Sequence, residues 1–260
     1  MAAILLDVDG VLHVSGEPIR GAAEAVDELR ERGHRLRFVT NSTTRSRHAL
    51  ADELRGFGIV LDDDELQTTA AAAARVLAGR RVLALTLPGV VDDLGDDVSL
   101  VGFGVDAVLL GGLGEDPAEN ARVFSYPNLA RAFAEIEEGA ELYCLHKNRW
   151  WQTKHGPMLD SGAFVAGLEY AAEVEATVLG KPSAAYFDAA LAALDADAAL
   201  TWMVGDDLES DIRGAHACGL RTVLVRTGKF RPDEVERSPL RPDGIVSSIA
   251  QLPEWIEEHL

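Results

Sequence analysis

The strongest constraint on the fold lies near the start of the chain, where an apolar run ends in two carboxylates. Residues Ile4 to Leu6 favour a strand, and Asp7, Asp9 and Gly10 follow within four positions. A spacing of i and i+2 places both carboxylates on one face of a strand, and Gly10 permits a turn where the strand ends. Because open α/β sheets bind ligands beyond the carboxyl ends of their strands, the pattern predicts a site around Asp7 and Asp9.

Two carboxylates this close repel each other and stay ionised only with positive charge beside them, which a divalent metal ion supplies. Three further oxygen-bearing stretches follow strand-like apolar runs and are suited to complete such a site: Thr40-Asn41-Ser42, Gly180-Lys181-Pro182, and Gly205-Asp206-Asp207 with Asp211. Three carboxylates suit Mg²⁺, which keeps several waters for a substrate phosphate to displace. The sequence therefore predicts a magnesium site at the ends of several strands.

The remaining groups of these stretches are suited to an anion. The Thr40 hydroxyl, the backbone N–H groups of Asn41 and Ser42 at the expected start of a helix, and the Lys181 ammonium would surround a phosphate. Asp7 is then a nucleophile that forms an aspartyl-phosphate, and Asp9 a general acid and base. An Asp-x-Asp alone is more often a solvated turn, so the prediction depends on the joint occurrence of all four stretches.

Composition limits the partners and the location. The 260 residues include 24 basic and 43 acidic side chains, and the net charge of -19 disfavours nucleic acid and anionic membrane as partners. We expect small molecules or proteins instead. Cys144 and Cys218 have no metal-ligand spacing and are predicted to be free thiols in a reducing compartment. No signal run or membrane-length apolar segment is present, which predicts a cytoplasmic protein.

Strand-like and helix-like segments alternate along the chain, which predicts an α/β protein with parallel sheets. The first part contains the strand ending at Asp7, a helix over 21–32, a strand over 36–39, a helix capped by Ser42 or Thr43, and a helix over 68–77. The middle part contains strands over 82–85, 105–110 and 141–145, a helix over 129–136 and a helix capped by Asp160 or Ser161. The last part contains strands over 176–179, 201–204 and 222–225 and helices over 184–194, 209–218 and 248–259.

The middle part reads as an insertion. We predict a catalytic core made of residues 1–80 and 176–260, with residues 81–175 forming a separate α/β cap domain. Insertions of this kind are tolerated when their ends lie close together at the surface of the core.

The four stretches resemble the motifs of the haloacid dehalogenase (HAD) superfamily of phosphatases. DVDG at 7–10 is similar to its first motif, Thr40 in VTNS to its second, Lys181 in GKP to its third and GDDLESD at 205–211 to its fourth. The resemblance implies a Rossmann-like parallel sheet, with Asp7 as nucleophile and Asp9 as the acid/base that also offers its backbone carbonyl to Mg²⁺. It further implies Asp206 as a direct metal ligand and Asp211 as a supporting one.

The insertion resembles the type-two cap of HAD subfamily IIA. HKNRWW at 146–151, GAFVAGLEYA at 162–171 and VRTGKFR at 225–231 are most similar to the branch of phospholysine phosphohistidine inorganic pyrophosphate phosphatases. The resemblance implies a homodimer through the cap. His146, Lys147 and Arg149 form a basic edge that either contacts a phosphorylated substrate or is an exposed strand end. His13 is expected to line the entrance of the site.

The sequence therefore predicts a magnesium-dependent phosphatase that acts on small phosphorylated compounds through an aspartyl-phosphate on Asp7. One alternative within enzymes is a hydrolase of pyrophosphate or of phosphoramides such as phospholysine and phosphohistidine. A non-enzymatic alternative is a receiver-like signalling domain that is phosphorylated on aspartate. Receivers are much shorter, and their phosphorylated aspartate lies on a middle strand, whereas Asp7 ends the first.

Overall fold

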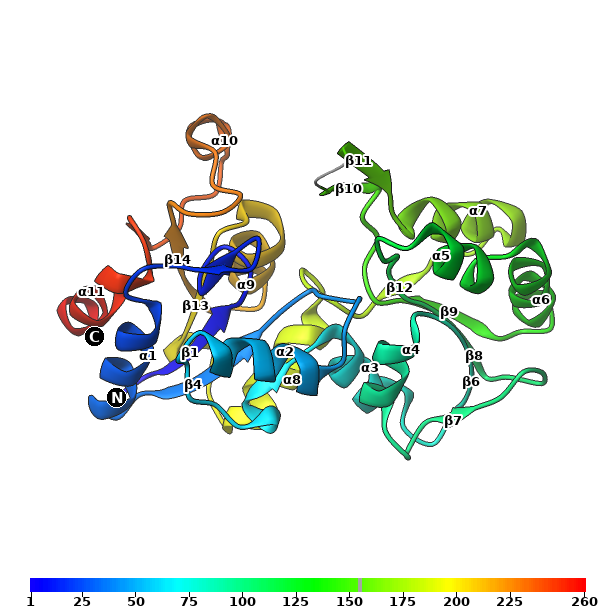
Figure 1. Ribbon diagram of the computed structural model, residues 1–260, viewed down its shortest axis with the longest axis horizontal. Coiled ribbons are helices and arrows are strands. Elements are labelled where there is room, and N and C mark those ends of the chain that lie inside the picture. Colours follow the sequence, from blue (N-terminus) through cyan, green and yellow to red (C-terminus); the bar gives the residue numbers. More distant parts are fainter. Residues whose placement is uncertain (154–155) are drawn as a thin grey trace. The chain divides into compact units, whose positions relative to one another are not determined.

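The computed structural model describes residues 1–153 and 156–260, which form two compact units (Figure 1). Unit 1 contains residues 1–40, 48–67 and 181–260. Unit 2 contains residues 41–47 and 68–180. The α/β class expected from the sequence is confirmed, because both units are built on parallel sheets covered by helices.

Unit 1 is organised by a six-stranded parallel sheet of order β15-β14-β13-β1-β4-β5. Its strands are β1 (Ala3–Asp7), β4 (Arg35–Val39), β5 (Leu66–Gln67), β13 (Thr201–Gly205), β14 (Arg221–Val225) and β15 (Gly244–Val246). All five residues of β1 are buried, as expected for a central strand of a sheet covered on both faces. A short hairpin of β2 (His13–Val14) and β3 (Glu17–Pro18) follows β1.

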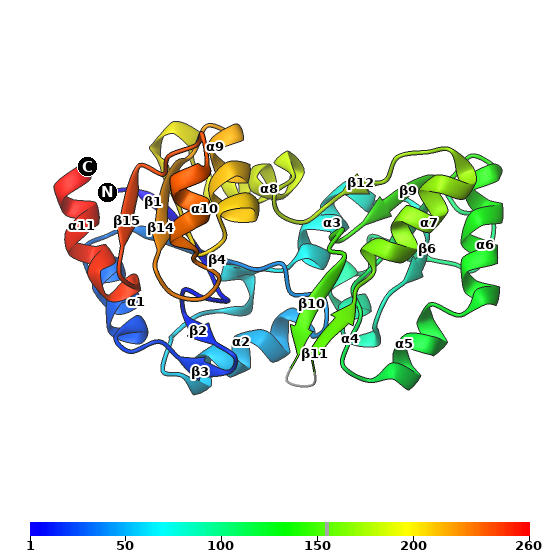
Figure 2. The ribbon, with the colours of Figure 1, turned by 90° about the horizontal axis from the view of Figure 1, so that it is seen from above.

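Helices cover both faces of this sheet (Figure 2). On one face, α1 (Ala22–Glu31), α2 (Arg47–Gly56) and α11 (Leu252–His259) bury their apolar stripes against the strands. The buried positions of α1 are Ala22, Ala25, Val26 and Leu29, which is the helical spacing seen in the sequence. On the other face lie α8 (Ala184–Leu194) and α9 (Gly214–Ala217), and the remaining helix of the unit is α10 (Pro232–Arg237).

The strand order fixes the place of a ligand site. The chain runs from β1 outward to β4 and β5, and later returns to the other side of β1 through β13, β14 and β15. The order therefore reverses between β1 and β13. Ligands of open α/β sheets bind at such a switch point, beyond the carboxyl ends of the strands. Asp7 ends β1, and Asp206 directly follows β13.

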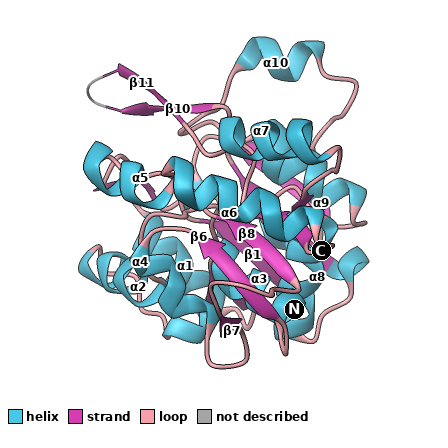
Figure 3. Cartoon of the chain, turned by 90° about the vertical axis from the view of Figure 1, so that its right-hand side faces the viewer, coloured by secondary structure: helices cyan, strands magenta, loops and turns pink. Residues whose placement is uncertain are grey.

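Unit 2 has a five-stranded parallel sheet of order β12-β9-β8-β6-β7, of which Figure 3 labels β6, β7 and β8. Its strands are β6 (Arg81–Leu85), β7 (Ser99–Leu100), β8 (Ala107–Leu110), β9 (Glu141–Cys144) and β12 (Thr177–Val178). A hairpin of β10 (Trp150–Thr153) and β11 (Gly156–Leu159) follows β9. The helices of the unit are α3 (Thr69–Leu77), α4 (Pro88–Val91), α5 (Pro117–Val123), α6 (Tyr126–Glu137) and α7 (Gly162–Ala172).

Alternate residues of the strands of unit 2 enter two different apolar clusters. Val108 and Leu110 of β8 pack with α6 and α7, whereas Ala107 and Leu109 pack with α3 and α4. This alternation follows from the two-residue period of a strand and explains why β8 is apolar throughout.

Two elements differ from the sequence-based expectation. The strand expected over 176–179 as part of the core is β12, which pairs with β9 in the sheet of unit 2. Its neighbour Leu179 is buried in the cluster of unit 2 that contains Leu145, and a two-residue strand carries too little pattern to reveal its partner. Units 1 and 2 accordingly divide near residues 67/68 and 180/181. The division into a catalytic core and a cap domain at 80/81 and 175/176 remains a prediction.

The second difference concerns the start of α2. The helix begins at Arg47 and not at Ser42 or Thr43. The backbone N–H of Arg47 lies 2.9 Å from each carboxylate oxygen of Asp93, so a side chain distant in the sequence satisfies the first turn. Asn41 and Ser42 therefore precede the helix, and the expectation that their N–H groups belong to a helix start is wrong.

In the part that the structure describes, no helix has the length and apolar character needed to cross a bilayer. Cys144 and Cys218 are free thiols, as expected.

Candidate active site

The site begins where β1 ends. Asp7 is 5 % exposed, and the chain turns directly after it through Gly10, whose φ of 86° lies in the left-handed region that glycine tolerates. The Gly10 N–H donates to the carbonyl of His13 at 2.7 Å and closes the turn. Thr227, in the loop after β14, donates its hydroxyl to the Gly10 carbonyl. The turn is thus fixed on both sides.

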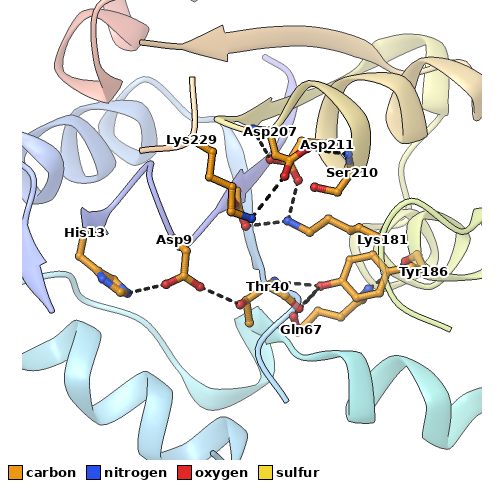
Figure 4. A network of polar contacts seen from close by, with 11 residues as sticks. Asp9, His13, Thr40, Gln67, Lys181, Tyr186, Asp207, Ser210, Asp211 and Lys229 are labelled. Carbon is orange, nitrogen blue, oxygen red and sulfur yellow. Dashed lines mark hydrogen bonds and ion pairs between the residues drawn. The ribbon is translucent and has the colours of Figure 1, made fainter. Parts of the chain in front are cut away.

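Lys181 lies between two buried carboxylates (Figure 4). Its Nζ is 2.6 Å from Asp7 Oδ1 and 2.7 Å from Asp211 Oδ1. Burial opposes the charged form of the lysine, but the carboxylates of Asp211 and Asp7 outweigh that effect and raise the pKa of Lys181 well above its ordinary value. Lys181 is therefore an ammonium ion that holds both carboxylates.

Asp206, at the end of β13, is held by the loop after β14. Its Oδ2 accepts the backbone N–H of Lys229 at 2.6 Å. A Cβ on Gly228 would overlap Asp206 Oδ2 and lie 2.7 Å from the Cα of Gly10, so the loop approaches this closely only because Gly228 has no side chain. Asp206 Oδ1 is buried and has no hydrogen-bond partner among the described residues.

The segment after Asp206 forms a π-helical turn, Leu208–Arg213, followed by α9. A single regular helix over 209–218 was expected, and π-helical turns of this kind occur frequently at functional sites. Asp207 caps the turn by accepting the N–H groups of Glu209 and Ser210 at 2.9 and 3.0 Å. Its own N–H donates to Asp211 Oδ2 at 3.1 Å, which orients that carboxylate.

Thr40, at the end of β4, is positioned by Tyr186 of α8. The Thr40 N–H donates to the Tyr186 hydroxyl at 2.9 Å, and the carbonyls of Thr40 and Gln67 lie 2.9 and 2.8 Å from the same oxygen (Figure 4). Burial raises the pKa of Tyr186, so the hydroxyl keeps its proton and donates it to one of these carbonyls. The carboxyl ends of β4 and β5 are thereby joined.

Among the described residues, the site contains three buried carboxylates and only one buried lysine. Burial and the neighbouring Asp211 raise the pKa of Asp7 well above its ordinary value. Burial raises the pKa of Asp206 to about 6, despite the opposing N–H of Lys229. Ligand oxygens of Asp7, Asp206 and Asp211 all lie within 4.8 Å of one another. With all three carboxylates ionised, as a bound cation would favour, they and the one ammonium would leave two negative charges, which is the complement of a divalent cation.

This cluster fits Mg²⁺. The three side chains offer only oxygen ligands, which this hard cation prefers, and the unpartnered Asp206 Oδ1 is a buried acceptor that a bound cation would satisfy. Asp7, Asp206 and Asp211 are therefore the residues that can hold it.

The structure brings together most of the predicted core residues. Asp7, Asp206, Asp211 and Lys181 form one buried cluster. The carboxylate of Asp9 contacts other groups, with Oδ2 3.4 Å from Thr40 Oγ1 and Oδ1 3.6 Å from His13 Nε2. A metal contact through the Asp9 backbone carbonyl remains a proposal.

Two other placements concern His13 and Lys229. His13 is 4 % exposed and its ring packs against Phe57, and its expected place at the entrance of the site remains a prediction. Lys229 was not singled out. Its Nζ lies 3.3 Å from Asp207 Oδ2, and the lysine lowers the pKa of Asp207 against the effect of burial. Only the glycine in TGKF hinted at this close approach.

The remaining predicted substrate residues belong to unit 2. Asn41 and Ser42 follow Thr40 directly and are partly buried. Lys147 is exposed and paired with Glu169 at 2.7 Å, and Arg149 is exposed. His146 is only 4 % exposed, so it does not belong to an exposed strand end.

The fold and the cluster of Asp7, Asp206 and Asp211 define an α/β protein whose site lies at the switch point of its sheet and is suited to a divalent cation. Sequence families agree with this class: haloacid dehalogenase-like hydrolases match residues 4–97, and HAD-hydrolase-like proteins match residues 178–252. The phospholysine phosphohistidine inorganic pyrophosphate phosphatase of Xenopus laevis is 38 % identical over 95 % of this chain and 92 % of its own length. Haloacid dehalogenase-like hydrolase domain-containing protein 2 of Bos taurus is 34 % identical over 100 % of this chain and 97 % of its own.

Solved structures of phosphatases have a similar fold. A p-nitrophenyl phosphatase from Archaeoglobus fulgidus has a TM-score of 0.88 with 27 % identity, and the match covers 98 % of each chain. A glycerol phosphate phosphatase from Mycobacterium tuberculosis, solved in complex with magnesium, has a TM-score of 0.84 with 27 % identity over 96 % of this chain and 76 % of its own.

The chain belongs to the haloacid dehalogenase superfamily, subfamily IIA, and is a phosphatase of that superfamily. The receiver-like alternative is therefore excluded, since the matched relatives are hydrolases over nearly their whole length.

The raised pKa of Asp206 predicts how stability depends on pH. Because the folded protein holds the Asp206 proton more tightly than the unfolded chain does, this contribution to stability is complete below about pH 4 and is lost as the pH rises through about 6. Without divalent cations, the free energy of unfolding of the wild type should fall relative to that of Asp206→Asn between these limits. Urea unfolding at several pH values measures the difference.

Magnesium should reverse this trend, because it binds the ionised carboxylate. The stabilisation of the wild type by Mg²⁺ should grow over the same pH interval and be smaller in Asp206→Asn. An equal pH dependence in both proteins would contradict the assignment.

Proposed function

We propose that the protein is a magnesium-dependent phosphatase of small phosphorylated compounds that works through an aspartyl-phosphate on Asp7. The observation that carries the proposal is the buried cluster in which Lys181 holds Asp7 at 2.6 Å beside Asp206 and Asp211. In relatives of this family, the named activities include p-nitrophenyl phosphatase and glycerol phosphate phosphatase. Both act on phosphate esters.

Asp7 performs the first displacement. Its carboxylate attacks the phosphorus, a new P–O bond forms, and the bond between phosphorus and the leaving oxygen breaks. Lys181 holds the attacking carboxylate in place, and Asp9 donates a proton to the leaving oxygen. Asp9 is suited to this role because its carboxylate is exposed and lies two residues after Asp7 on the same turn. Asp7, Asp206 and Asp211 would hold Mg²⁺, which would supply positive charge to neutralise the phosphoryl oxygens when bound.

The second displacement releases phosphate. A water molecule attacks the phosphorus of the aspartyl-phosphate, and Asp9, now ionised, takes a proton from that water. The P–O bond to Asp7 breaks, which restores the Asp7 carboxylate and frees inorganic phosphate. Thr40, Asn41 and Ser42 would bind the phosphoryl oxygens, and Lys147 and Arg149 are proposed to meet the rest of the substrate.

Variants of the two aspartates separate these steps. Asp7→Asn should abolish turnover without loss of the fold, as judged by circular dichroism. Asp9→Asn should hydrolyse an alkyl phosphate at least about 100-fold more slowly, because the alkoxide needs a proton to leave.

With p-nitrophenyl phosphate, whose leaving group needs no proton, Asp9→Asn should instead form the aspartyl-phosphate quickly and hydrolyse it slowly. Rapid-quench kinetics should then show a burst of nitrophenolate, and mass spectrometry a phosphate on Asp7. Full turnover by Asp7→Asn, or a phosphate on another residue, would refute the assignment.

A second candidate activity is the hydrolysis of pyrophosphate or of phospholysine and phosphohistidine. It is favoured by the activity for which the Xenopus laevis relative is named, since that relative matches 95 % of this chain. Cleavage of a P–N bond also needs a proton on the leaving nitrogen, and Asp9 can donate it.

A panel of phosphate esters, pyrophosphate and phosphohistidine, each assayed with Mg²⁺, decides between the candidates. We expect the highest kcat/KM among the esters. A kcat/KM for pyrophosphate or phosphohistidine about tenfold above that of every ester would favour the second candidate instead.

We also propose that two copies pair through unit 2. The lining of an apolar groove between α6 and α7 includes Leu129, Phe133, Phe164 and Leu168, and also Tyr126, which is 84 % exposed. Burying such a surface would stabilise a dimer. Light scattering should give the mass of a dimer for the wild type and of a monomer for Tyr126→Glu. A monomeric wild type would contradict the proposal.

A further inference from the structure

Three consecutive residues after Thr40 are each held by a different part of unit 2. A Cβ on Gly180 would lie 2.9 Å from Asn41 Oδ1, which indicates close packing at that point. The carbonyl of Ser42 accepts the hydroxyl of Thr69 at 3.3 Å. Thr43 Oγ1 lies 3.0 Å from His146 Nε2. Asn41 is thus closely packed, and Ser42 and Thr43 each make a hydrogen bond to another part of unit 2.

The hydrogen bonds of His146 define which nitrogen carries the proton. The Asn148 N–H donates to Nδ1 at 3.3 Å, so Nδ1 has a free lone pair and Nε2 bears the hydrogen. Nε2 therefore donates to Thr43 Oγ1. Burial lowers the pKa of His146 and favours this neutral form. The nearest carboxylate, Asp160, is 3.8 Å from Nδ1, too far for a hydrogen bond.

The contact between Thr43 and His146 is sealed from water. Both residues are 4 % exposed. Gly112, just after β8, covers them so closely that a Cβ there would overlap Thr43 Oγ1 and lie 2.7 Å from His146 Nε2. A buried hydrogen bond of this kind is costly to break, because either partner is then left without water to replace the other.

We propose that His146 is a positioning residue that fixes the segment Asn41–Thr43 for phosphate binding through its hydrogen bond to Thr43. This inference rests on the proposed function, in which Asn41 and Ser42 contact the phosphoryl group. In this role His146 acts through Thr43 and not through the substrate, whereas the sequence offered contact with a phosphorylated substrate as one of two alternatives. A segment ordered in advance binds phosphate more tightly, since less conformational freedom is lost on binding.

Two substitutions of His146 separate its two hydrogen bonds. In His146→Gln the amide nitrogen takes the place of Nε2 and can still donate to Thr43. In His146→Asn the amide oxygen takes the place of Nδ1 and can still accept from Asn148, but the donor to Thr43 is lost. Thr43→Val removes the same bond from the other side. Thr86→Val is the matched control, because Thr86 is also buried at a strand end of this sheet but its Oγ1 has no partner among the described residues.

Hydrogen–deuterium exchange tests the inference without substrate. The amides of residues 41–47 should exchange about tenfold faster in Thr43→Val and His146→Asn than in the wild type, and at nearly the wild-type rate in His146→Gln and Thr86→Val. Equal exchange in all five proteins, or faster exchange in His146→Gln than in His146→Asn, would overturn it.

Calorimetric titration with inorganic phosphate in the presence of Mg²⁺ tests the consequence. The Kd should rise about tenfold in Thr43→Val and in His146→Asn, and no further in the double variant, because both changes break one bond. Additive effects would overturn the inference. If the wild type bound no phosphate, the proposed function would fail, whereas the exchange experiment would still decide whether His146 fixes the segment.

Discussion

The ion pairs of Lys181 with Asp7 and Asp211 are the interactions on which the site depends. Burying an ammonium ion costs several kcal/mol in desolvation, and two carboxylates at 2.6 and 2.7 Å offset that cost. Asp206 adds a third buried carboxylate without a matching cation in the cluster. The described part of the chain therefore folds around more carboxylates than buried cations, and this imbalance is what a bound divalent cation would relieve.

Topology explains why these groups meet. Asp7 and Asp206 lie at the ends of β1 and β13, the neighbouring strands where the strand order reverses. The loop that carries Gly228 completes the arrangement. It lies directly against Asp206 because Gly228 has no side chain that would overlap the carboxylate. The backbone N–H of Lys229 then fixes one oxygen of Asp206 and leaves the other buried without a partner among the described residues. Strand order thus brings the carboxylates together, and the loop orients them.

Much of this site is predictable from the sequence, because Asp7, Thr40 and Asp206 each follow an apolar strand that belongs to one sheet. Other features depend on partners that local pattern does not reveal. The start of α2 is set by Asp93, 46 residues away from Arg47. The contact of Lys229 with Asp206 is made by a backbone N–H, which every residue except proline carries. His146 looks like a basic surface residue until its burial beneath Gly112 is known.

The central claim is that the buried carboxylates hold a divalent cation beside which Asp7 attacks the phosphorus of the substrate. Anomalous diffraction from a crystal grown with Mn²⁺, a common substitute for Mg²⁺, measures this directly. The account predicts one strong peak within coordination distance of Asp7, Asp206 and Asp211, and its loss in crystals of Asp206→Asn. A strong peak elsewhere, with none at these three carboxylates, would contradict it.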